Sequence, residues 1–141
     1  MTKPERFTLY KDALGVLGQL QAGGWRHAII TNHMPELPNI VIALGLSPYI
    51  EFCVDSALTG YEKPNPQAFR LALAMAGNPE QAWMVGDNMV SDIKGAEAIG
   101  IPAILVNVPH VHSNQVADIK DIRYQAADLT GVVKIIEENS R

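Results

Sequence analysis

Two carboxylates, Asp87 and Asp92, lie five positions apart in residues 84–100, MVGDNMVSDIKGAEAIG. An apolar run typical of a strand precedes the first, and a helical pattern follows it, so the pair sits at a turn from strand to helix. Two carboxylates, water and a phosphate oxygen form a ligand set that Mg²⁺ accepts. An aspartate in the first turn also stabilises a helix without any metal. The spacing alone therefore leaves a metal site and a structural role open.

Three further polar residues sit where they could bind an anion. Lys63 precedes a proline in GYEKPNP, which favours an extended backbone, and a lysine held near two carboxylates could bind a phosphoryl oxygen. Thr31 and Asn32 follow an apolar run, where a hydroxyl, an amide and the following backbone N–H groups can bind an anion. Taken alone, each signal also has a structural explanation: an exposed lysine before a helix is usually just solvated, and Thr and Asn are common in ordinary turns.

Alternating strand and helix patterns must position these residues. We expect strands at 27–32, 50–56, 81–87 and 102–108, a short edge strand at 124–128, and helices at 12–22, 35–45, 65–77, 91–100 and 129–141. Asn65 and Ser91 are the expected N-caps of two of these helices. Such alternation predicts an α/β fold with a parallel sheet that helices cover on both faces. Ligands of such sheets bind at the carboxyl ends of the strands, where Thr31, Asn32 and Asp87 lie.

Composition narrows the class of protein. The chain has 141 residues, 48% of them hydrophobic and 18% charged, which predicts one globular domain over residues 1–141. The net charge is −4 and no basic block is present, so we expect no nucleic-acid partner. Cys53 is the lone cysteine, which excludes an internal disulfide. With no apolar run long enough for a signal peptide or a bilayer span, we expect a cytoplasmic protein without a membrane partner.

The order of the motifs resembles the haloacid-dehalogenase-like (HAD) hydrolase superfamily from about residue 9 to about residue 130. A strand ending in Thr31 and Asn32 comes first, Lys-Pro-Asn-Pro at Lys63 second, and Val-Gly-Asp-Asn with Asp87 and Asp92 third. GYEKPNPQAF is similar to the phosphoglycolate-phosphatase-like branch. The resemblance implies a three-layer, Rossmann-like core and Mg²⁺-dependent hydrolysis of a small phosphate ester through an aspartyl phosphate. It implies catalytic roles for Thr31 and Lys63, phosphate binding by Thr31, Asn32 and Lys63, and metal binding by Asp87 and Asp92.

Two parts of the family pattern have no match in these 141 residues: the nucleophilic Asp-x-Asp after an apolar strand, and the cap domain. We therefore expect an N-terminally incomplete core that is inactive, or nearly so, by itself. The alternative is a degenerate, non-catalytic relative used for binding or assembly. In the family the missing strand lies between those expected here at 27–32 and 81–87. We expect these two strands to pair directly or to be bridged by another chain, in a homo-oligomer or with a second protein.

Overall fold

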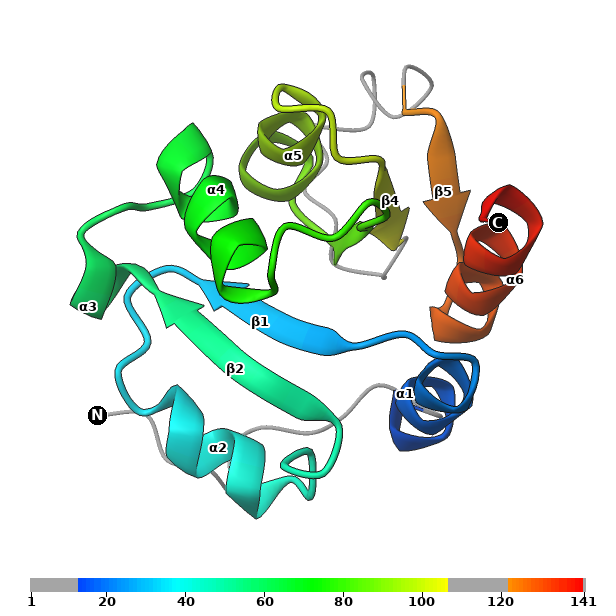
Figure 1. The fold of residues 1–141 in the computed structure, drawn as a ribbon, viewed down its shortest axis with the longest axis horizontal. Helices are drawn as coiled ribbons and strands as arrows, with labels where there is room; N and C mark the ends of the chain where they lie inside the picture. The colour runs from blue at the N-terminus through cyan, green and yellow to red at the C-terminus, as the bar shows by residue number, and fades with distance from the viewer. Residues whose placement is uncertain (1–12, 107–121, 141) are drawn as a thin grey trace. The chain divides into compact units, whose positions relative to one another are not determined.

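The computed structural model describes residues 13–106 and 122–140 (Figure 1). The chain divides into two compact units, Met1–Glu62 and Lys63–Arg141, and each contains a parallel sheet. The α/β class with parallel strands is thereby confirmed. The single domain over residues 1–141 stays a prediction, and each unit is described by itself.

The first unit is built on two parallel strands. Its elements are α1 (Ala13–Ala22), β1 (His27–Thr31), α2 (Leu37–Ala43), β2 (Ile50–Asp55) and α3 (Ser56–Thr59) (Figure 1). β1 pairs with β2 so that Thr31 lies opposite Asp55 at the carboxyl ends. The buried apolar side chains of α1 and α2 include Val16, Leu20, Leu37, Ile40 and Val41, which lie at helical spacing within each helix. The short α3 was not predicted, because its only local signals are an Asp55 cap and Gly60 at φ +81°.

The second unit contains a three-stranded sheet. Its elements are α4 (Pro66–Met75), β3 (Met84–Gly86), the π-helical turn η2 (Met89–Lys94), α5 (Gly95–Glu97), β4 (Ala103–Val106), β5 (Tyr124–Ala126) and α6 (Leu129–Asn139) (Figure 1). The strand order is β3–β4–β5, and all neighbours are parallel. η2 packs against β3 and β4, while α6 packs against β4 and β5. The central strand β4 is fully buried, which explains its continuous apolar sequence.

The helix N-caps test the local predictions. Asn65 caps α4 as expected, accepting a hydrogen bond from the Gln67 N–H at 2.9 Å. Ser91 as a cap is wrong: Asn88 Oδ1 accepts from the backbone N–H groups of Val90 and Ser91, so the helical segment starts earlier and opens with η2. Both residue types cap well, and the earlier asparagine takes the position because β3 ends at Gly86.

The expectation about a missing strand concerns β1 of the first unit and β3 of the second. Within its own unit, β1 pairs with β2, and β3 pairs with β4. That β1 and β3 pair directly, or are bridged by a strand from another chain, stays a prediction. None of the helices within residues 13–106 and 122–140 is long and apolar enough to cross a bilayer.

Candidate functional site

Lys63 and Asp92 form a buried ion pair in the second unit. Lys63 Nζ lies 2.6 Å from Asp92 Oδ1, and the two side chains are 11% and 8% exposed. Asp92 Oδ2 accepts a hydrogen bond from the Asn88 backbone N–H at 3.2 Å. Each oxygen of this carboxylate therefore has a protein donor. Asp92 fixes the lysine amine on one side and closes the turn after β3 on the other.

Gly86 makes room for this carboxylate. A Cβ added at Gly86, the last residue of β3, would lie 2.5 Å from Asp92 Cγ, far inside contact distance. The glycine before Asp87 and the asparagine after it thus have separate physical tasks: one leaves space for Asp92, and the other caps η2. Sequence reasoning assigned neither task. Its only signals were a glycine at a strand end and an asparagine within capping distance of the next helix.

Asp87 follows β3 directly and is exposed, whereas Asp92 is buried. Within the described ranges, no three or more His, Cys, Asp or Glu side chains form a group that could hold a metal ion. Mg²⁺ nevertheless keeps several waters and commonly binds through one or two carboxylates plus substrate phosphate oxygens. The donors at this turn fit that mode: Asp87 as an exposed carboxylate ligand, and Asp92, already hydrogen-bonded, as the group that orients its surroundings.

Thr31 and Asn32 belong to the first unit, at the carboxyl end of β1. The two amides that follow them are engaged by side chains at the end of β2 and the start of α3. The His33 N–H donates to Ser56 Oγ at 2.8 Å, and the Met34 N–H donates to Asp55 Oδ1 at 3.1 Å. These two N–H groups are therefore engaged within the protein. Anion binding by the Thr31 hydroxyl, by Asn32 and by the N–H groups that follow them stays a prediction.

The five predicted site residues are thus distributed over both units. The structure brings Lys63 and Asp92 into contact and places Asp87 on the same turn as Asp92. Thr31 and Asn32 are placed by the β1–β2 sheet. That the two groups form one site stays a prediction.

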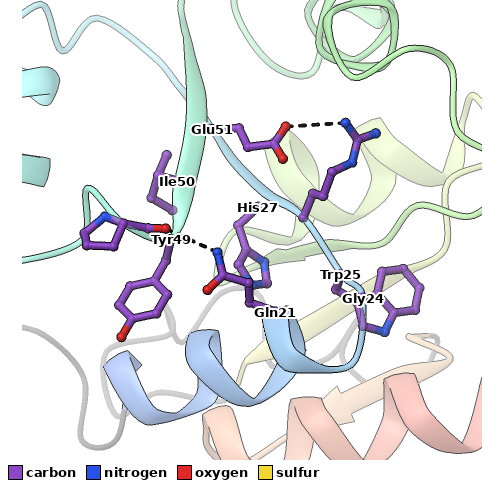
Figure 2. A pocket seen from close by; sticks show the side chains of 9 residues that line it. Gln21, Gly24, Trp25, His27, Tyr49, Ile50 and Glu51 are labelled. Carbon is purple, nitrogen blue, oxygen red and sulfur yellow. Dashed lines mark hydrogen bonds and ion pairs between the residues drawn. The ribbon is translucent and has the colours of Figure 1, made fainter.

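A cavity of about 280 Å³ opens at the amino-terminal end of the β1–β2 pair (Figure 2). Its lining residues are Gln21, Gly24, Trp25, Arg26, His27, Pro48, Tyr49, Ile50 and Glu51. Several of its polar side chains bind one another or nearby backbone: Gln21 donates to the Pro48 carbonyl at 3.2 Å, and Arg26 pairs with Glu51 at 3.4 Å. It contains none of the predicted site residues, since Thr31 lies at the opposite end of the strand.

Comparison with known proteins identifies a family to which this chain is similar. Residues 2–100 match the family model described as haloacid dehalogenase-like hydrolase. The chain is 36% identical over 104 residues to a phosphoserine phosphatase from Thermus thermophilus, covering 72% of this chain and 42% of that protein. It is 37% identical over 103 residues to a ribulose-1,5-bisphosphate 5-phosphatase from Halopiger xanaduensis, covering 72% of this chain and 43% of that protein.

Solved structures show the same fold. A HAD phosphatase from Thermococcus onnurineus superposes with a TM-score of 0.83 at 24% identity, covering 94% of this chain and 60% of that one. The chain thus spans less than half of the two curated relatives, although almost all of it is covered by this fold.

Proposed function

Because the chain belongs to the haloacid dehalogenase-like hydrolase family, we propose that it is core sequence of a Mg²⁺-dependent phosphatase that acts on a small phosphate ester. The observation that carries the proposal is the largely buried ion pair between Lys63 and Asp92, because Asp92 lies in η2 directly after the exposed Asp87. Burying two charges removes them from water, and this desolvation can cost more free energy than their attraction returns, so stability alone gives little reason for such a pair. It is useful where a fixed ammonium must meet an anionic substrate.

Each residue has a proposed task toward the phosphoryl group. The Thr31 hydroxyl donates a hydrogen bond to one phosphoryl oxygen, and Asn32 binds beside it. Lys63, oriented by Asp92, donates to a second oxygen and offsets negative charge that builds up there. Asp87 would hold the Mg²⁺, and Asp92 would orient the groups around it. When bound, the metal supplies positive charge that stabilises the transferring phosphoryl group.

The proposed hydrolysis through an aspartyl phosphate needs a nucleophilic carboxylate. The seven aspartates of this sequence are at 12, 55, 87, 92, 118, 121 and 128, and no Asp-x-Asp occurs among them. The nucleophile must therefore come from protein sequence outside these 141 residues. The chain alone is expected to turn over phosphate esters poorly or not at all.

The lack of an Asp-x-Asp in these 141 residues favours a second candidate function: a non-catalytic relative that binds a phosphorylated partner or serves in assembly. Upstream coding sequence separates the two. An in-frame apolar segment ending in Asp-x-Asp supports the enzyme, and p-nitrophenyl phosphate with Mg²⁺ then measures activity of the extended chain. Turnover that Asp87→Asn abolishes contradicts the non-catalytic reading.

Ligand binding tests the proposal on the chain itself. Mg²⁺ with inorganic phosphate should raise the unfolding temperature, since a ligand at ten times its Kd stabilises by about 1.4 kcal/mol. Asp87→Asn should remove the Mg²⁺-dependent part of this stabilisation. Glu80→Gln, which removes an exposed carboxylate from the same unit, is the matched control and should leave it intact. Equal stabilisation of the wild type and Asp87→Asn by Mg²⁺ would contradict the proposed metal site.

A further inference from the structure

Two consecutive polar side chains are buried where β2 ends and α3 begins: Asp55 is 4% exposed and Ser56 is 5% exposed. Buried polar groups cost free energy unless they are hydrogen-bonded. Ser56 Oγ accepts from the His33 N–H at 2.8 Å, and Asp55 Oδ1 accepts from the Met34 N–H at 3.1 Å. Each side chain therefore binds one of two successive backbone amides in the loop that follows Thr31.

His33, within this loop, has a strained backbone. Its φ is +50°, in the left-handed region that residues with a Cβ seldom adopt. Such strain persists only where the surroundings impose it, and it is concentrated at functional sites. Here the Ser56 hydroxyl holds the His33 N–H, while the imidazole Nε2 lies 3.4 Å from Glu62 Oε2. The path of the chain after Thr31 is thus set by contacts with distant residues.

The sheet holds the same segment from its other side. Thr31 is the register partner of Asp55, so the backbone pairing of β1 and β2 fixes the residue just before the loop. Side chains of Asp55 and Ser56 fix the residues just after it. Thr31 and Asn32 are the two residues between these restraints. Small displacements of groups that bind a reacting substrate are costly, which gives such restraint a functional use.

We propose, on the premise of the phosphatase function above, that Asp55 and Ser56 are positioning residues that hold Thr31 and Asn32 in place for a phosphoryl group. Ser56 acts through the His33 amide and Asp55 through the Met34 amide. Asp55 Oδ2 is buried without a hydrogen-bond partner among the described residues. Asp55→Asn can keep an oxygen at the position of Oδ1, and it should therefore keep the hydrogen bond from the Met34 N–H.

Amide hydrogen exchange of the ¹⁵N-labelled chain tests the restraint. Ser56→Ala should accelerate exchange at His33 about fivefold or more, as the loss of one hydrogen bond predicts. Ser56→Thr retains the hydroxyl and should restore protection. Thr59→Ala is the matched control, because its hydroxyl accepts from the exposed Tyr61 N–H in the same unit and does not touch the loop. Asp55→Asn should keep protection at Met34.

Titration with inorganic phosphate in the presence of Mg²⁺ tests the positioning. Ser56→Ala should weaken phosphate binding about fivefold, read from the Thr31 and Asn32 resonances, with Ser56→Thr and Thr59→Ala close to wild type. Wild-type affinity in Ser56→Ala despite faster His33 exchange overturns the positioning role. If wild type binds no phosphate, the proposed function fails separately. The positioning role then stands only if Ser56→Ala shifts the Thr31 and Asn32 resonances, and unchanged resonances overturn it.

Discussion

Lys63 and Asp92 are 29 positions apart in sequence, yet Lys63 Nζ lies 2.6 Å from Asp92 Oδ1 in a largely buried environment. The contrast is with Arg26 and Glu51, which are 3.4 Å apart with side chains 53% and 45% exposed. Water screens the second pair and offsets most of its attraction. The first pair has little access to water, so the attraction between its charges is screened much less.

Breaking the buried pair should destabilise the chain strongly. Asp92→Asn removes the negative charge that lies beside the largely buried Lys63 ammonium, and the free energy of unfolding should fall by about 3–5 kcal/mol. Urea unfolding at pH 7 measures this. The double variant K63M/D92N should recover part of the loss, because it removes the buried ammonium as well and keeps an acceptor for the Asn88 N–H.

The control for that experiment is Glu51→Gln, which should cost less than about 1 kcal/mol because the Arg26 pair is exposed. An equal loss in Asp92→Asn and Glu51→Gln would show that burial adds nothing to the Lys63 pair.

Gly86→Ala should displace Asp92. The added methyl group would lie 2.5 Å from Asp92 Cγ, so the carboxylate or the end of β3 must move. Overpacking of this kind costs about 1–3 kcal/mol, measurable by thermal or urea unfolding. Gly15→Ala is the matched control, since no atom lies within 4 Å of its added Cβ in α1. That change should stabilise the helix by about 0.5–1 kcal/mol, and destabilisation by both would refute a steric cause at Gly86.

Cys53 should react slowly with iodoacetamide. Burial, and secondly the negative charge of Asp55, raise the pKa of the Cys53 thiol above its ordinary value. The thiolate is the nucleophile, so its small population at pH 8 limits the rate, which should increase as pH rises toward that pKa. Asp55→Asn removes the second cause and should accelerate alkylation at pH 8. An unchanged or slower rate in Asp55→Asn would contradict the electrostatic contribution.

Strand edges should make the chain associate. Within its own unit, among the described residues, β1 pairs with β2 alone and β3 with β4 alone, so each unit presents a strand edge that a strand from another chain could pair with. Sedimentation equilibrium should therefore give a mass above the 15.4 kDa of one chain. Leu58 is 82% exposed, and Leu58→Ser tests whether an apolar surface drives association instead. A monomer at every concentration, or association lost in Leu58→Ser, would argue against strand pairing.

Local patterns in the sequence determined the elements. The apolar run at 27–32 predicts a strand, and Asn65 before Pro66 predicts the start of α4, because strand and cap preferences act over a few residues. The alternation of these elements was enough for a parallel α/β fold. The order of the motifs that contain Thr31, Lys63 and Asp87 was enough to predict the family, which the family model confirms.

Tertiary structure decided which side chains meet. No local preference couples Lys63 to Asp92, or Ser56 to the His33 amide 23 positions away. The N-cap is Asn88 and not Ser91. Its position follows the end of β3, and the backbone N–H of Asn88 is bound by the buried Asp92 carboxylate. Hydrogen bonds of buried polar groups form between segments that only packing brings together. The sequence by itself therefore determined the elements and the family, and the fold decided the contacts that hold the candidate site.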